Sequence, residues 1–141
     1  MKLEDQVVSL ELAKKLKEIG VKQESYFSWQ SLTNEKWHIG HTHANHLYEK
    51  KGRNEFYSAF TACELGEMLP SSIESYGLEI YSTSSLLNGG KFGGNNLWHI
   101  RYADKVNELF ERKCGIKECD ARAEMFIYLI ENKLIEVNNA R

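Results

Sequence analysis

The chain has few of the features that assign a protein to a class from sequence alone. Its longest apolar stretch is MFIYLI, at positions 125–130 of 141 residues, far below the roughly 20 residues that a membrane-spanning helix needs. Its formal net charge is −2, so it lacks the strongly basic surface with which proteins bind DNA or RNA. We therefore expect neither a membrane nor a nucleic acid polymer as a partner.

Cysteine is also scarce. The three cysteines are an odd number and form no CxxC pair, which argues against a disulfide framework. The first 20 residues carry charges throughout and lack the apolar core of a signal peptide. The sequence thus predicts a cytoplasmic protein with reduced thiols.

The usual motifs of catalysis are missing. HExxH and GxSxG do not occur, and the glycine-rich stretch GGKFGG at 89–94 is followed by no GK[ST]. We expect Cys63 to be a buried structural thiol, and Cys114 and Cys119 have no activating pattern near them in the sequence. The sequence therefore predicts no catalytic residues and no cofactor, and a protein that is not an enzyme.

What is present indicates one compact α+β domain over residues 1–141. Helices are expected after Ser9, within a capping box that joins Thr61 to Glu64, and over residues 120–132 with Asp120 as the cap. The last helix is apolar on more than one side, so it should be well buried by this chain or by a partner subunit. Strands are expected at 26–32, 36–40, 78–84 and 97–102, with 105–112 interpreted as a strand rather than a helix. The expected fold is an antiparallel sheet of about four to five strands with helices packed on one face.

The stretch HIGHTHANH, at 38–46, contains four of the five histidines. His38, His41, His43 and His46 are candidate metal ligands, because zinc takes imidazole nitrogens. However, Gly40 and Asn45 interrupt every regular spacing, so no continuous element presents all four rings. We expect a polar loop here, with a metal site as the alternative.

Strand alternation predicts a functional face on the sheet. Trp98, Ile100 and Tyr102 should face the core, so that His99 and Arg101 point the other way. On the same argument His38 and Tyr81 share this outer face, and Lys91 and Trp29 are candidates to join it. Arginine offers paired donors to phosphate, and tyrosine or histidine can stack on a base. The alternative is an ordinary exposed strand face, which is polar by design.

Three segments resemble small bacteriophage and prophage proteins of uncharacterised function. They are VVSLELAKKLKEIGVKQESYFSW at 7–29, AFTACELGEMLP at 59–70 and DARAEMFIYLIENKLI at 120–135. The resemblance covers most of the chain but brings no active site with it. Some phage proteins of this kind act as sponges for the cyclic or adenosine-containing nucleotide signals of bacterial immune systems such as Thoeris and CBASS. The resemblance therefore implies a protein of the host bacterial cytosol that acts against host defence.

The predicted function is sequestration of a small anionic nucleotide, of the cyclic dinucleotide or cyclic ADP-ribose type, without cleavage. Tight binding favours a deep site closed by a loop, at 41–55 or 86–96, or by a second subunit, so we expect a homo-oligomer. Two alternatives stay open: a metal-dependent nucleotide hydrolase that uses the histidines of 38–46, and a protein–protein inhibitor of a host defence effector. The predicted ligand-binding residues are Trp29, His38, Tyr81, Lys91, His99 and Arg101.

Overall fold

The computed structural model describes residues 1–31, 36–42, 56–84 and 96–137. Its elements are the 3-10 helix η1 (Leu3–Asp5), the helices α1 (Leu10–Glu18), α3 (Ala62–Met68) and α4 (Glu118–Glu131), and the strands β1 (Phe27–Gln30), β2 (His38–His41), β3 (Phe56–Ser58), β4 (Ser72–Ile73), β5 (Tyr76–Thr83), β6 (Leu97–Ala103) and β7 (Lys113–Gly115). No helix within these described ranges is long and apolar enough to cross a membrane.

The strands form two antiparallel sheets, which confirms the expected α+β class but not the single sheet. One sheet has the order β2-β1-β3 and the other β4-β5-β6-β7. The expected hairpin is present, since Trp29 of β1 pairs with Ile39 of β2. Strand β3 then occupies the other edge of β1, where Trp29 pairs with Tyr57. Both edges of β1 are therefore taken within the smaller sheet, and β1 pairs with no strand of the larger one.

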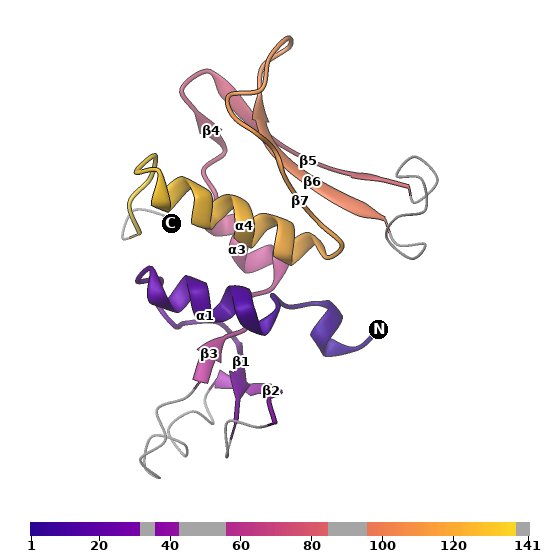
Figure 1. The fold of residues 1–141 in the computed structure, drawn as a ribbon, viewed down its shortest axis with the longest axis vertical. Coiled ribbons are helices and arrows are strands. Elements are labelled where there is room, and N and C mark those ends of the chain that lie inside the picture. Colours follow the sequence, from indigo (N-terminus) through magenta and orange to yellow (C-terminus); the bar gives the residue numbers. More distant parts are fainter. Residues whose placement is uncertain (32–35, 43–55, 85–95, 138–141) are drawn as a thin grey trace.

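The helices lie between the two sheets. Figure 1 shows the larger sheet at one end, then α4 with α3, then α1, and the smaller sheet at the other end. Helix α4 is the centre of the core, with buried residues on several of its sides, among them Met125, Phe126 and Leu129. It contacts β6 and β7 on one side and α1 and α3 on the other. The apolar character of this helix is therefore accounted for within one chain.

Local sequence signals determine the helix ends to different degrees. The capping box is confirmed, because Glu64 N–H donates to Thr61 Oγ1 at 3.2 Å and Thr61 N–H donates to Glu64 Oε2 at 2.8 Å. The expected cap of the last helix is wrong, since α4 begins at Glu118 and places Asp120 inside its first turn. There Asp120 Oδ1 accepts a hydrogen bond from the backbone N–H of Ser9 at 2.8 Å, which joins α4 to the start of α1.

The segment 105–112 is neither a strand nor a helix, so the predicted strand is wrong. Asp104 Oδ1 accepts hydrogen bonds from the backbone N–H groups of Val106 and Asn107, at 2.8 and 2.7 Å, and so folds the chain into a turn. A single bridge between Ala103 and Glu108 follows. Strand pairing resumes only at β7, and the turn leaves the Glu108 side chain over the larger sheet.

Candidate functional site

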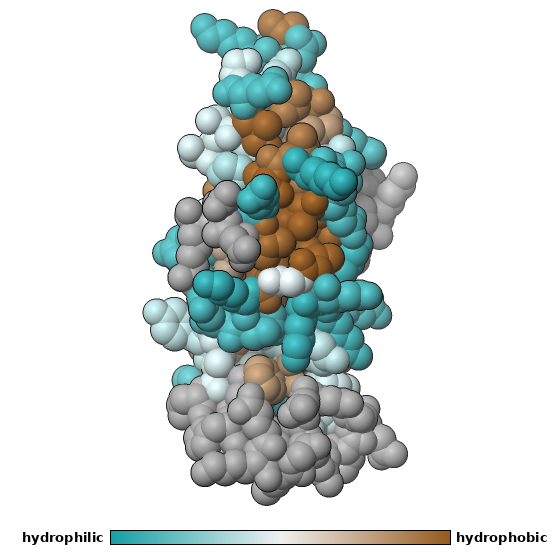
Figure 2. Space-filling view, turned by 90° about the vertical axis from the view of Figure 1, so that its left-hand side faces the viewer, coloured by the Kyte–Doolittle hydropathy of each residue, from teal (hydrophilic) through white to brown (hydrophobic). Residues whose placement is uncertain are grey.

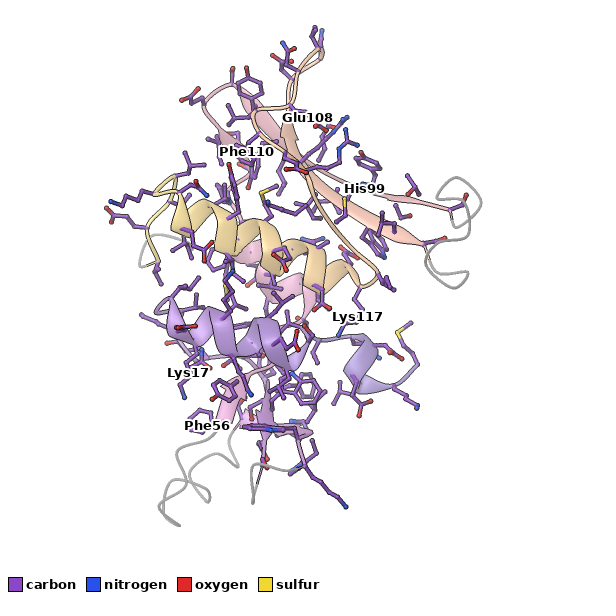
Figure 3. The ribbon with its side chains drawn as sticks, viewed as in Figure 1. Lys17, Phe56, His99, Glu108, Phe110 and Lys117 are labelled. Atoms are coloured by element: carbon purple, nitrogen blue, oxygen red, sulfur yellow. The ribbon has the colours of Figure 1, made fainter. Side chains whose placement is uncertain are left out.

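The predicted alternation along β6 is confirmed. Ile100 and Tyr102 are fully buried in the core cluster and Trp98 packs against it. His99 and Arg101 therefore point to the opposite face, which we call the outer face. Figure 3 shows His99 and Glu108 on the side of the sheet away from α4, whereas Phe110 points toward that helix.

Three strands contribute one row of side chains to the outer face. In the register of the sheet, His99 lies between Tyr81 of β5 and Cys114 of β7. The Tyr81 and His99 rings are stacked, with centroids 4.8 Å apart and planes 10° apart. Toward β7, His99 Nδ1 lies 3.2 Å from Cys114 Sγ. Toward β5, His99 Nε2 lies 2.9 Å from Thr83 Oγ1. Both imidazole nitrogens thus have polar partners.

A second row consists of charged groups. Arg101 Nε donates to Glu79 Oε2 at 2.6 Å, and Arg101 Nη1 donates to Glu108 Oε1 at 3.1 Å. Arg112 forms an ion pair with the same oxygen of Glu108 and also donates to the Tyr81 hydroxyl. The guanidinium carbons of Arg101 and Arg112 lie 5.3 and 5.9 Å from the centre of the Tyr81 ring.

We call these residues together the outer-face cluster: Glu79, Tyr81, Thr83, His99, Arg101, Glu108, Arg112 and Cys114. Its two arginines and two glutamates sum to a formal charge of zero, 2 − 2 = 0. Glu108 is the shared partner, because one of its oxygens contacts both guanidinium groups. Any anion that binds these arginines must therefore compete with Glu108.

The surroundings of His99 favour its neutral form. Burial is the main cause that lowers the His99 pKa below the usual 6.5, and the positive charges of Arg112 and Arg101 lower it further. The negative charge of Glu108 partly opposes this by raising the pKa. Burial also raises the pKa of the Cys114 thiol, partly opposed by Arg112. Near neutral pH this pair is therefore a neutral imidazole beside a protonated thiol.

The structure brings together only some of the predicted ligand-binding residues. Tyr81, His99 and Arg101 are neighbours in the outer-face cluster. The expectation that His38 shares their face is wrong, because β2 belongs to the smaller sheet. Trp29 also lies in the smaller sheet, where its indole Nε1–H donates to the Val8 carbonyl at 2.9 Å. Lys91 and almost all of the two proposed closing loops lie outside the described residues.

The histidine-rich stretch is described only in part. His38 and His41 lie three positions apart on β2, so an extended strand directs them to opposite faces. His41 packs near the Phe27 ring, with centroids 5.4 Å apart. His43 and His46 lie outside the described residues. Within the described ranges, no group of three or more histidine, cysteine or carboxylate side chains is placed to hold a metal ion.

Sequence reasoning missed part of the cluster. It interpreted Cys114 as a thiol with no activating neighbour, yet His99 lies beside it through strand pairing. It also omitted Arg112 and Glu108. The alternation of Arg112, Lys113 and Cys114 could have suggested that Arg112 and Cys114 share a face, but not which strand lies opposite.

The expected burial of Cys63 is wrong, because Cys63 is exposed and lies about 200° around α3 from the buried Leu65.

Three hollows of about 490, 500 and 510 Å³ are lined by described residues. Tyr81, His99 and Arg101 line none of these three, and the second reaches the cluster only at Cys114. The proposed ligand therefore does not belong in these three hollows, and a closed site on the outer face needs a further cover.

Comparisons with known proteins found no match, whether against protein-family models, curated proteins or solved structures.

Proposed function

We propose that this chain is a phage-encoded binding protein that sequesters a host nucleotide immune signal without cleaving it. The observation that carries the proposal is the stacked Tyr81–His99 pair with two guanidinium groups beside it, on the sheet face away from α4. Aromatic rings offer a stacking surface to a base, and arginines bind phosphate through paired donors. The proposed ligand class is the cyclic dinucleotides and cyclic ADP-ribose isomers.

The charge balance of the cluster indicates how the anion would bind. The phosphate takes the place of the Glu108 carboxylate between Arg101 and Arg112, while Glu79 stays on the far side of Arg101. Glu108 follows a turn and pairs with the sheet only by its bridge to Ala103. This bridge is made by the backbone, so the Glu108 side chain can rotate away from the arginines without breaking strand pairing. In this proposal Glu108 competes with the ligand.

The proposal includes a homo-oligomer. Figure 2 shows a band of hydrophobic side chains on one side of the molecule, at the level of the larger sheet and α4. Exposed apolar patches of this kind mark surfaces of association. Partly buried hydrophobic residues at this level include Ile73, Ile135 and Val137.

The proposal is tested by measuring the melting temperature with a panel of cyclic dinucleotides and cyclic ADP-ribose isomers. A ligand at 100 times its dissociation constant adds about 2.7 kcal/mol to stability. Arg101→Ala and Arg112→Ala should weaken binding about 10- to 100-fold, since each removes hydrogen bonds to a charged group. Glu108→Gln should strengthen binding because the competing charge is gone. Lys22→Ala removes one exposed charge from the loop after α1 and serves as the control.

Two outcomes would count against the proposal. If no member of the panel shifts the melting temperature, direct inhibition of a host effector becomes the better explanation. If a ligand binds but the two arginine variants bind it like the Lys22→Ala control, the site is elsewhere.

Mass spectrometry of the ligand released by heating separates sequestration from hydrolysis, since a sponge returns its ligand intact. Native mass spectrometry of the same sample counts the chains, and a single chain would remove only the oligomer from the proposal.

A further inference from the structure

His99 has one nitrogen beside a hydroxyl and the other beside a thiol. Its Nε2 lies 2.9 Å from Thr83 Oγ1, and its Nδ1 lies 3.2 Å from Cys114 Sγ. In a neutral imidazole one nitrogen carries the proton and the other accepts. The tautomer protonated at Nε2 donates to the Thr83 hydroxyl and leaves Nδ1 able to accept the Cys114 proton. Thr83 thereby orients the ring with Nδ1 toward the thiol.

The same pair combines an accessible nucleophile with a shielded base. Cys114 is exposed and lies on β7, the edge strand of the larger sheet. His99 is only 9% exposed and is fixed by Tyr81 and Thr83. Neutral imidazole is the form that can accept a proton, and the lowered pKa of His99 keeps it neutral at pH 7. A substrate could reach the sulfur while the base stays in place.

We propose that Cys114, with His99 as its general base and Thr83 as a positioning residue, is a nucleophilic centre for acyl transfer. The Cys114 sulfur attacks the carbonyl carbon of an activated ester or thioester while His99 Nδ1 takes the thiol proton. The carbon–leaving group bond breaks, and His99 returns the proton to the leaving oxygen or sulfur. Water then attacks the thioester on Cys114, which releases a carboxylic acid and restores the thiol.

Two cationic groups define the class of acyl donor. Arg112 lies two positions before Cys114 and Arg101 two positions after His99. Because β6 and β7 are antiparallel, both arginines lie beside the pair at the same end of it, on the outer face. They favour donors whose carboxylate or phosphate can take the place of Glu108 near the reacting carbonyl. This activity goes beyond nucleotide binding and does not depend on it, because the proposed nucleotides carry no acyl group. Either proposal can therefore fail without the other.

The test measures acylation of the whole chain by 4-nitrophenyl acetate. We expect a burst of about one nitrophenolate per chain and one acetyl group on Cys114 by intact-mass and peptide mass spectrometry. Cys114→Ala should abolish the burst, whereas Cys63→Ala, which removes another exposed thiol, should preserve it. His99→Gln keeps polar atoms but no base, and it should slow acylation at pH 7 by 100-fold or more. Thr83→Val should slow it by about 10-fold.

The pH profile of the wild-type chain is a readout that a purely structural histidine would not change. With a general base, the rate rises as His99 loses its proton and levels off before about pH 7, because its pKa lies below the usual value of about 6.5. An unassisted thiol would instead gain about 10-fold per pH unit toward its own pKa of about 8.5 or above. Several charged or titratable groups contact the pair or act on it through their charge: Tyr81, Arg101, Glu108, Glu111, Arg112 and Lys113. Of these, Lys113 lies over the Tyr128 ring of α4, on the other face of the sheet.

Equal acylation of Cys114 and Cys63 would overturn the proposal, as would a rate that climbs steadily between about pH 6.5 and 8 like that of a free thiol. Circular dichroism should show that each variant is folded. If His99→Gln does not fold, the wild-type pH profile and the Thr83→Val rate still decide the question.

Discussion

At the scale of single residues, Tyr102 shows how a buried polar atom is accommodated. Its ring is fully buried and its hydroxyl donates to the Pro70 carbonyl at 2.7 Å, which joins β6 to the segment after α3. Burial raises the pKa of this hydroxyl, so it stays neutral and donates. Tyr102→Phe should lower the free energy of unfolding by about 1–2 kcal/mol, because the Pro70 carbonyl then loses its partner. Urea titration measures the loss.

The matched control for this change is Tyr26→Phe. Tyr26 is 77% exposed, so the same deletion of one oxygen should change stability by less than about 0.5 kcal/mol. Equal effects of the two substitutions would mean that the bond to Pro70 contributes nothing.

At the scale of elements, α3 depends on contacts beyond its own seven residues, since a helix this short is not stable alone. Glu64 supplies several of these contacts. Besides its capping bonds to Thr61, its carboxylate accepts from Ser25 Oγ and from Tyr26 N–H, both at 3.1 Å. Glu64→Ala should therefore cost about 2–3 kcal/mol of stability, measured by chemical denaturation.

Glu67→Ala on the same helix is the control, because Glu67 is exposed. It removes one carboxylate but no capping bond. A loss as large as that of Glu64→Ala would show that helix propensity or net charge, rather than the bonds of Glu64, controls α3.

At the scale of the whole molecule, the two sheets share one core. A single cluster of buried hydrophobic residues includes Leu16 of α1, Ile100 of β6 and Met125 of α4, and both Trp29 and Trp98 pack against it. The prediction of a single domain then implies one cooperative unfolding transition. Variants that keep only Trp29 or only Trp98 should show the same fluorescence midpoint in urea.

Each of these variants carries two Trp→Phe changes among three tryptophans, so its fluorescence is compared with its own circular dichroism. Agreement of the two midpoints within each variant is expected. A smaller sheet that unfolds at lower urea than the larger one would divide the chain into two folding units.

The sequence by itself determined the features that depend on neighbouring residues. Thr61 with Glu64 starts α3, because a capping box is a contact over three positions. Helix α1 begins directly after Ser9 as expected, although the Ser9 side chain makes no capping hydrogen bond. The alternation along β6 likewise separated His99 and Arg101 from Ile100, since it requires only that a strand has one buried face.

Only the tertiary structure decided which strands pair and in what register. Every residue except proline offers the same backbone N–H and C=O groups to a neighbouring strand. The sequence therefore does not state that β3 pairs with the second edge of β1 in a separate sheet, or that Cys114 lies opposite His99. The turn at Asp104 replaced the strand expected at 105–112 and placed Glu108 between two arginines. Trp29 and His38 were separated from Tyr81 for the same reason: strand partners are chosen by how the whole chain packs.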